Sequence, residues 1–327
     1  MTIERLAATS LTPWIARPEL HAARIADALD SALAPSTRAA YRGALDRLAR
    51  WARRERFVEP MSPACLAAYV TELAETGRSA SAIGQVLAAV AREAFETGAP
   101  DPTQDPVLRQ VVEGSRRRVA EHHVVRRAHP MTTPELARIL AAIDQETVVG
   151  RRDAAITALL YAGAFRRSEV AAFNRSEFTV GADGIRILVR RSKRDQLAVG
   201  ETVGIARGKH AATDPVRLVT RWLAGRGKVG PTEPVFVKVT RTGALCSSHM
   251  TGHAIGEIIK SRAKAAGLDA PITGHSGRRG HVSTAILAGS DLAVVAKTTR
   301  HKSLSSLMLY ADELRVMERT TSADLGL

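Results

Sequence analysis

A tyrosine near the end of the chain follows a histidine by nine residues. Tyr310 and His301 stand in the stretch TRHKSLSSLMLY, whose spacing predicts a short helix. At about 100° per residue, Tyr310 lies off the centre of the apolar stripe of this helix. That stripe consists of Leu304, Leu307, Met308 and Ala311. A tyrosine hydroxyl becomes a nucleophile when positive groups or a base help to remove its proton. Tyr310 is therefore a candidate nucleophile, and a tyrosine at the edge of the core is the alternative.

A second pair of polar residues begins the stretch HSGRRGHVSTAILAG. His275 and Arg278 are three residues apart, so they share one face of a predicted helix, and Val282 and Ile286 continue that face. Polar groups at the head of an inward-turning stripe indicate a cleft, whereas an exposed His and Arg near a helix start are the other interpretation. A guanidinium offers paired N–H donors, which suit phosphate oxygens.

Two further candidates have a common structural explanation. Arg166 interrupts the apolar run YAGAFRRSEVAAF and precedes Glu169, a pairing that also stabilises many helix ends. Lys193 lies in RRSKRDQ, a predicted turn between two strands, where a lysine is usually exposed and has no catalytic role. Taken alone, each of these candidates is weak evidence for an active site.

The elements that must hold these residues begin with a helical bundle. Helices are predicted at 36–55, 62–77, 81–98 and 105–121. Ser36 is the expected N-cap of the first helix, Ser62 and Pro63 start the second, and Gly98 ends the third.

The second half of the chain is predicted to be mixed. Thr133 is the expected cap of its first helix, with Pro134 at the first position. Alternating β-branched residues broken by Gly and Asp predict a small antiparallel sheet within 178–205. Further helices are predicted at 151–162, 167–173, 213–224, 248–266, 275–289, 291–297 and from 303 onward. The expected fold class is mainly α with a small antiparallel β-sheet.

The expected domain organisation has four parts. They are a flexible N-terminal tail (1–20), a helical domain (21–120), a basic linker (121–131) and a second domain (132–327) with a C-terminal tail (311–327).

The charge of the chain indicates an anionic partner. The formal net charge is +14, for which a nucleic acid is the commonest partner, although a generally basic protein is the alternative. There is no long apolar run, and the start MTIERLAATS lacks a signal-peptide core, so no membrane partner is expected.

Neither cysteines nor histidines predict a metal site. Cys65 and Cys246 are far apart without a CxxC motif, which argues against a disulfide framework and fits a reducing cytoplasm. His249 and His253 are four apart, but no Glu follows His249 as in HExxH, so both are interpreted as helix-surface residues. No metal and no cofactor are expected.

The set and order of the candidates resemble the tyrosine recombinase (phage integrase) family, in particular its simple Cre-like and Xer-like members. The shared features are an Arg after a Gly-containing helix, a hairpin Lys, His-x-x-Arg, and a His with Tyr nine residues later, over residues from about 20 to the end. Three positions depart from the usual pattern: Arg300 stands where Gly is usual, Arg279 where many members have a second His, and Ser276 replaces a frequent Asp.

The resemblance implies a role for each matching residue. Tyr310 matches the nucleophile, and Arg166 and Arg278 match the arginines that hold the scissile phosphate. His275 and His301 match further phosphate-contacting positions, Lys193 matches the lysine that protonates the leaving 5′ oxygen, and Glu169 matches a supporting acid. Arg166 is chosen over Arg167 because the family pattern places its Arg two residues before Ser-Glu.

The implied function is site-specific cleavage and rejoining of DNA through a 3′-phosphotyrosine, by a helical core-binding domain joined to a catalytic domain. The expected partners are double-stranded DNA with short inverted repeats and further copies of the chain, two per site and four in the synapse. The expected DNA contacts are Arg116, Arg117, Arg118, Arg126, Arg127 and Lys260. A non-catalytic DNA-binding protein on this fold and a type IB topoisomerase are the alternatives.

Overall fold

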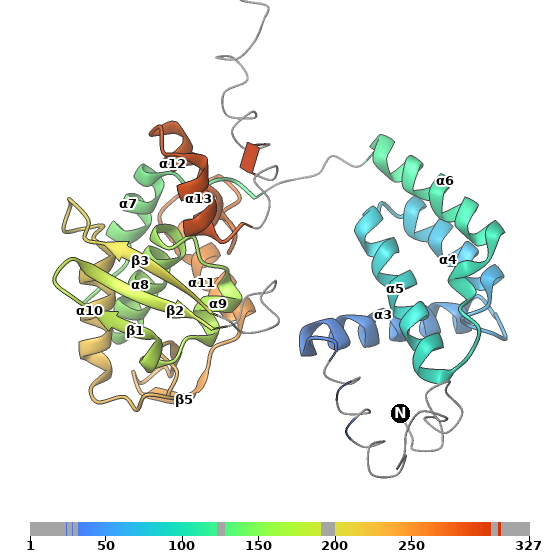
Figure 1. Cartoon of the computed structure of the whole chain (residues 1–327), viewed down its shortest axis with the longest axis horizontal. Helices are drawn as coiled ribbons and strands as arrows, with labels where there is room; N and C mark the ends of the chain where they lie inside the picture. The colour runs from blue at the N-terminus through green and yellow to red at the C-terminus, as the bar shows by residue number, and fades with distance from the viewer. Residues whose placement is uncertain are drawn as a thin grey trace, which may run out of the picture. The chain divides into compact units, whose positions relative to one another are not determined.

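The computed structural model describes residues 32–122, 128–190, 200–301 and 307–308, and the single residues 24 and 28. The chain divides into two compact units, Met1–Arg126 and Arg127–Leu327 (Figure 1), and each is described by itself. The predicted tails 1–20 and 311–327 lie outside the described residues, as do residues 123–127 of the predicted linker. The four predicted domain boundaries therefore stay predictions.

The described part of the first unit is a helical bundle. It consists of α3 (Pro35–Arg54), α4 (Pro63–Glu75), α5 (Ala80–Thr97), a short 3-10 turn η2 (Pro102–Gln104) and α6 (Pro106–His122). Helix α3 packs on α5, and α4 packs on α6. The core between them contains Leu48, Trp51, Leu66, Ile83, Val90 and Leu108, all buried.

The predicted helix ends agree with the structure for α4 and α5 and differ from it for α3. Ser62 caps α4 by accepting a hydrogen bond from the backbone of Cys65, and Gly98 ends α5 in the left-handed conformation at φ 65°. The predicted cap Ser36 is wrong, because α3 begins one residue earlier at Pro35. The fixed φ of proline suits the first position of a helix, so Pro35 starts α3 and Ser36 lies within its first turn.

The second unit contains helices and two small sheets. Its first part consists of α7 (Thr133–Ala141), α8 (Val148–Ala162), α9 (Arg167–Ala172), η3 (Arg175–Glu177), β1 (Phe178–Val180), β2 (Gly184–Val189) and β3 (Glu201–Ala206). Its second part consists of α10 (Pro215–Arg226), β4 (Val237–Val239), β5 (Leu245–His249), α11 (Gly252–Ala265), α12 (Ser276–Leu287) and α13 (Leu292–Thr299). The expected mainly α fold with a small antiparallel sheet is confirmed.

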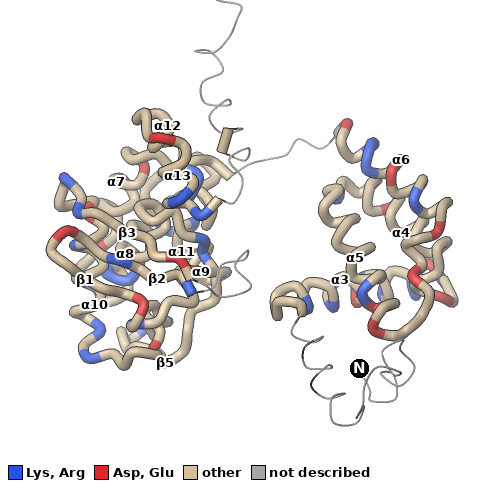
Figure 2. Tube along the Cα trace, in the orientation of Figure 1, with Lys and Arg blue, Asp and Glu red and all other residues tan. Residues whose placement is uncertain are grey.

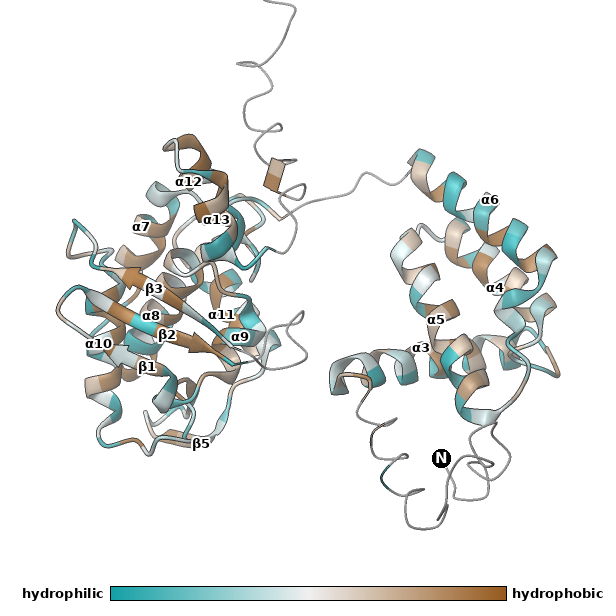
Figure 3. Ribbon diagram, in the orientation of Figure 1, coloured by the Kyte–Doolittle hydropathy of each residue, from teal (hydrophilic) through white to brown (hydrophobic). Residues whose placement is uncertain are grey.

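The predicted sheet over 178–205 is present as the antiparallel order β1-β2-β3. Ile187 of β2 lies opposite Phe178 of β1 and Val203 of β3. These residues are buried, whereas Arg186 and Gly204 next to them are not, so the alternation along β2 and β3 marks the face on the core. Figure 3 shows this pattern as brown, hydrophobic stretches in both strands.

A second hairpin replaces the start of a predicted helix. The helix expected from residue 248 begins at Gly252, because Leu245–His249 pairs with Val237–Val239 as an antiparallel strand. His249 is therefore on strand β5 and not on a helix surface. Its Nδ1 atom lies 3.0 Å from the carbonyl oxygen of Ala171. His253 is exposed on α11.

One predicted cap of the second unit is shifted by one residue. Thr132, not Thr133, caps α7, and it forms a capping box with Glu135. The Thr132 hydroxyl oxygen accepts from the backbone N–H of Glu135, and the Glu135 carboxylate accepts from the backbone N–H of Thr132. Thr133 is the first residue of the helix, and its hydroxyl contacts that of Tyr161 at 2.7 Å.

Helix α8 lies at the centre of the second unit. Residues 152–160 are all buried, and α7, α9, α10, α11 and α12 pack around the helix. Two glycines let α12 approach its neighbours closely. A Cβ atom on Gly277 would lie 3.0 Å from the backbone of Leu160, and one on Gly280 would lie 1.7 Å from the carbonyl oxygen of Met131. In the part of the chain that the structure describes, no helix is both long and apolar enough to cross a bilayer.

Candidate active site

The turn between α8 and α9 positions Arg166. Ala164 has a positive φ of 45°, which reverses the chain so that Arg166 becomes the N-cap of α9. The Glu169 carboxylate accepts from the backbone N–H of Arg166 at 2.8 Å and from its Nη1 at 2.6 Å. Glu169 is buried, and 14% of the Arg166 side chain remains exposed, so the guanidinium is fixed on one side and reachable from the other. The neighbouring Arg167 is exposed.

Arg278 joins three segments that are distant in sequence. It lies in the first turn of α12 and is buried. Its Nη1 donates to the carbonyl oxygen of Ala164 at 2.8 Å, and its Nη2 donates to the carbonyl oxygen of Thr299. The close approach of α12 to α8 at Gly277 brings Arg278 within reach of the turn that carries Arg166.

His301 follows α13 and contacts Arg278. Its Nδ1 lies 2.5 Å from Oγ1 of Thr299, which itself donates to the carbonyl oxygen of Val295 at 2.7 Å. Its Nε2 lies 3.3 Å from Nη2 of Arg278. Because a guanidinium only donates, Nε2 accepts in this contact, and Nδ1 carries the proton that it donates to Thr299. These two contacts place a proton on Nδ1 and make Nε2 the acceptor.

His275 lies at the entrance of α12. The predicted helix starts at this residue, but α12 begins at Ser276, and His275 is the N-cap with helical φ and ψ. Its backbone N–H donates to Oγ1 of Thr273 at 3.3 Å, and its side chain is exposed. His275 and Arg278 therefore adjoin at the start of α12, with the histidine on the solvent side.

Four predicted site residues lie outside the described residues: Tyr310, Lys193, Arg126 and Arg127. Lys260 is exposed on α11. Arg116, Arg117 and Arg118 are exposed on α6 of the first unit, where basic and acidic residues alternate (Figure 2). Arg117 forms an ion pair with Glu113 one turn away. Their DNA contacts stay predictions.

The predictions missed two residues of this cluster. Thr299 fixes the orientation of His301, and nothing in its spacing distinguishes it from Thr298. Arg300 is buried beside Glu169, with 2.8 Å between its Nη2 and Oε2 of the carboxylate. Its only signal in the sequence is that it occupies a position where Gly is usual. Burial lowers the pKa of Arg300, and the charge of Glu169 opposes this effect.

His281 lies on α12, one turn after Arg278. Its Nδ1 donates to the carbonyl oxygen of Tyr161 at 3.0 Å. Burial is the main cause that lowers the pKa of His281; the bond to Tyr161 opposes it, and the positive charges of Arg278 and Arg300 add to it. His281 lines a hollow of about 320 Å³ between β3, α12 and α13, whose other walls are mostly small and apolar.

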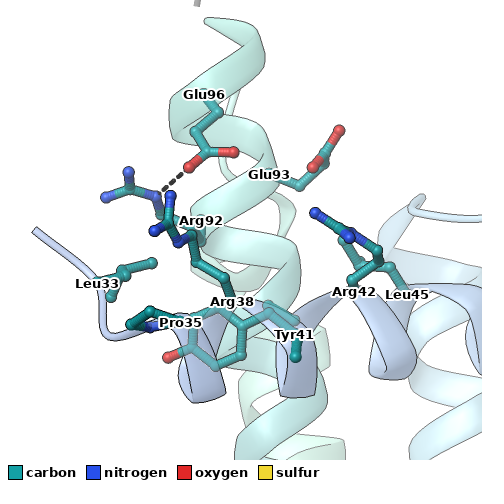
Figure 4. Close-up of a pocket in the computed structure, with 11 residues that line it drawn as sticks. Leu33, Pro35, Arg38, Tyr41, Arg42, Leu45, Arg92, Glu93 and Glu96 are labelled. Atoms are coloured by element: carbon teal, nitrogen blue, oxygen red, sulfur yellow. Dashed lines mark hydrogen bonds and ion pairs between the residues drawn. The ribbon is translucent and has the colours of Figure 1, made fainter. Parts of the chain in front are cut away.

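A larger hollow, of about 590 Å³, lies in the first unit between the start of α3 and the end of α5 (Figure 4). Arg38 and Arg42 of α3 line it, together with Arg92 and Glu96 of α5, which pair at 2.5 Å. None of the residues that the sequence analysis singled out for chemistry lines this hollow. We therefore take the Arg166, Arg278 and His301 cluster as the candidate site.

The described geometry suits an anionic tetrahedral group. The guanidiniums of Arg166 and Arg278 and the imidazole of His301 come from three segments. They are linked through the α8–α9 turn, where Glu169 pairs with both Arg166 and Arg300. Among the described residues, no group of three or more His, Cys, Asp or Glu side chains could hold a metal ion.

Comparisons with known proteins agree on one family. The model of the phage integrase family matches residues 130–315. An integrase/recombinase xerD homolog of Selenomonas ruminantium is 29% identical over 217 residues, which are 64% of this chain and 61% of that protein. The match thus spans about three fifths of the relative's length.

Solved structures show the same fold. A lambda integrase dimer bound to a COC′ core site matches with a TM-score of 0.57 and 18% identity, covering 89% of this chain and 75% of that one. The Tn1549 transposon integrase in complex with transposon right end DNA matches with a TM-score of 0.56 and 14% identity, covering 98% and 99%.

Proposed function

This chain belongs to the phage integrase family, and we propose that it is a site-specific DNA recombinase that cuts and rejoins strands through a 3′-phosphotyrosine. One observation carries the proposal. Arg166, Arg278 and His301 come from three distant segments and form one hydrogen-bonded cluster around the α8–α9 turn. Two arginines and a histidine at one point offer the N–H donors that suit a phosphodiester, and the apolar core does not need them.

We assign the following step to the site. Tyr310 gives its phenol proton to an imidazole of the His/Arg cluster, and its oxygen attacks phosphorus. The bond from phosphorus to the 5′ oxygen breaks, and Lys193 supplies the proton that the leaving oxygen needs. Arg166 and Arg278 donate to the non-bridging oxygens and counter the charge that develops in the transition state. The tyrosyl phosphodiester keeps the bond energy, so a 5′-hydroxyl of another strand can attack it without ATP.

His275 and His301 are proposed as further donors to the phosphate. His275 is already at the exposed side of the cluster. In the described network Nε2 of His301 accepts from Arg278, so His301 donates to phosphate through Nε2 only after it gains a proton there or changes tautomer. We therefore propose that the protonation or the tautomer of His301 changes when the phosphate binds.

Double-stranded DNA is the proposed partner. The net charge of +14 favours a polyanion, and the two structural relatives named above were solved with DNA. Arg116, Arg117, Arg118, Arg126, Arg127 and Lys260 are the proposed backbone contacts, for which affinity falls steeply with salt. The proposed target carries short inverted repeats, each site takes a dimer and the synapse a tetramer, all in the cytoplasm.

The domain assignment is part of the proposal. Residues 21–120 would form the core-binding domain, 121–131 the basic linker and 132–327 the catalytic domain. The family model begins at residue 130, which supports the last of these boundaries.

Recombination of the DNA that flanks the gene tests the function. A plasmid with two copies of its inverted repeats should be inverted or resolved by the wild type and not by Tyr310→Phe, with junctions at one sequence position. Relaxation of any supercoiled plasmid at random positions would instead indicate a topoisomerase. Specific binding with no strand transfer by the wild type would indicate a DNA-binding protein without catalysis.

A further inference from the structure

Arg300 combines burial with an unfavourable backbone. Its φ of 56° and ψ of 47° are left-handed, a conformation that residues other than glycine seldom adopt. Only 3% of its side chain is exposed. A buried charge in a strained backbone persists only where the surrounding contacts determine it. The role of Arg300 should therefore follow from the contacts of its guanidinium.

These contacts connect two parts of the site. Arg300 Nη2 lies 2.8 Å from Oε2 of Glu169 and 3.3 Å from the carbonyl oxygen of Ala164. Its Nη1 donates to the carbonyl oxygen of Thr298 at 2.9 Å, and its guanidinium lies 4.9 Å above the ring centre of Phe165. One side chain thus ties the α8–α9 turn to the end of α13.

Arg166, Arg278 and His301 are each one step away from Arg300. Arg166 shares the Glu169 carboxylate with it, through Oε1. Arg278 shares the carbonyl oxygen of Ala164 with it. His301 is the next residue in the chain. We propose that Arg300 is a positioning residue, which holds Arg166, Arg278 and His301 in register for the scissile phosphate; this rests on the proposed function.

Arg300 also changes the charge of the site. The Glu169 carboxylate alone would neutralise Arg166, because +1 and −1 sum to zero. With Arg300 on its second oxygen the trio carries +1 − 1 + 1 = +1. At a site with little solvent this charge acts over a longer range than it would in water. Because Arg300 offsets the charge of Glu169, the positive charge of Arg166 can still attract the phosphate. The same contacts of Arg300 fix the position of Glu169 and the α8–α9 turn.

A purely structural role is the rival explanation, and Arg152 provides the matched control. As whole residues, Arg152 and Arg300 are equally buried, each with 7% of its surface exposed, and Arg152 pairs with buried Asp153. It lies ten residues before the end of α8, about 15 Å along the helix at 1.5 Å per residue. None of the contacts described for it is to Arg166, Arg278 or His301. Arg152→Met should lower stability and leave the site as it is.

The first test needs no DNA. In ¹H–¹⁵N spectra, a guanidinium held by ion pairs rotates slowly and its Nη protons give separate signals. Arg166→Lys and Arg278→Lys identify the signals of these two residues by their disappearance. In Arg300→Gly, whose glycine suits the left-handed backbone, we expect these signals to merge, and in Arg152→Met to stay separate. Separate signals in a folded Arg300→Gly protein would overturn the positioning role.

The second test measures the chemistry. On a nicked duplex that carries the inverted repeats flanking the gene, we expect Arg300→Gly to lower the single-turnover cleavage rate by about tenfold or more, since small misplacements cost up to about a hundredfold. The Kd for the duplex should change by less than about threefold, because Arg300 is buried. Arg300→Lys, which keeps the charge and loses the planar fork, should lie in between.

The outcomes separate the two proposals. An unchanged cleavage rate in Arg300→Gly, or an equal loss in Arg152→Met, would overturn the role of Arg300 while the recombinase assignment stands. Failure of the wild type to form any Tyr310-dependent product would overturn the proposed function, and the spectra would still decide whether Arg300 orders the two arginines.

Discussion

Nη2 of Arg278 lies 3.3 Å from Nε2 of His301, so an arginine at the start of α12 and a histidine after α13 meet directly. Arg278 also donates to Ala164, in the turn that presents Arg166. Through Arg300, the guanidiniums of Arg166 and Arg278 and the imidazole of His301 are therefore held by one continuous set of contacts. A substitution of any one of these residues should therefore displace the others.

Glu169 should be essential for stability as well as activity. Glu169→Gln removes the counter-charge of two arginines, and breaking a buried ion pair typically costs about 3–5 kcal/mol. We expect urea unfolding to show a loss of this size, together with slower cleavage. The control Glu96→Gln removes the half-exposed partner of Arg92 and should cost less than about 1 kcal/mol. Equal costs for both variants would show that the Glu169 pairs are not formed.

The glycines of α12 should not tolerate a methyl group. A Cβ on Gly280 would lie 1.7 Å from the carbonyl oxygen of Met131, so Gly280→Ala must move α12 away from that segment. Overpacking of this kind costs about 1–3 kcal/mol, and the displaced Arg278 should slow cleavage. Gly114→Ala on α6 meets nothing within 4 Å and should stabilise by up to about 1 kcal/mol. Thermal unfolding of both variants tests this prediction, and a stable, active Gly280→Ala protein would contradict it.

Thr299 should act through His301. Thr299→Val removes the acceptor of the Nδ1 proton, so the ring loses its fixed tautomer and orientation. We expect cleavage to slow by about tenfold, with little change in DNA affinity. Thr298→Val is the matched control, because Thr298 makes the same type of bond to a helix carbonyl, at Val294, without touching His301. If both valine variants cleave at the same rate, Thr299 has no role in orienting the ring.

Acid should destabilise the protein partly through His281. The pKa of His281 is lowered, chiefly by burial, so the unfolded state takes up a proton near pH 6.5 before the folded state does. Stability should therefore fall as the pH drops below about 6.5, and this contribution should be absent above it. His281→Asn should flatten the fall in urea midpoint between about pH 7.5 and pH 5.5. A wild type and a variant with the same pH dependence would contradict this assignment.

The local part of the fold could be predicted from the sequence. Ser62, Pro63 and Gly98 mark helix ends by chemistry that acts within a few residues, and Ile185, Ile187 and Val189 reveal β2 by their alternation. The β4–β5 hairpin was missed, because the residues of β5 (LCSSH) lack such alternation and stand directly before a helix. The N-cap of α3 lies two residues before the predicted Ser36, and that of α7 one residue before the predicted Thr133, since several adjacent residues could each start these helices.

The site was predicted less completely, because its decisive contacts are distant in sequence. The pairing of Arg166 with Glu169 spans three residues and follows from helix spacing. The contacts of Arg278 with Ala164 and of Arg300 with Glu169 span 114 and 131 residues, and no spacing rule contains them. Arg300 could be noticed as a departure from a pattern, but its left-handed backbone and its burial appear only in the folded chain.

The most direct measurement locates the covalent bond. The protein is incubated in EDTA with a nicked duplex that carries the inverted repeats flanking the gene, digested with protease, and analysed by mass spectrometry. We predict one peptide that contains Tyr310 and carries a nucleotide through its 3′-phosphate, absent from Tyr310→Phe and formed without added metal. An adduct on another residue, or cleavage that needs Mg²⁺ and leaves no adduct, would contradict the account.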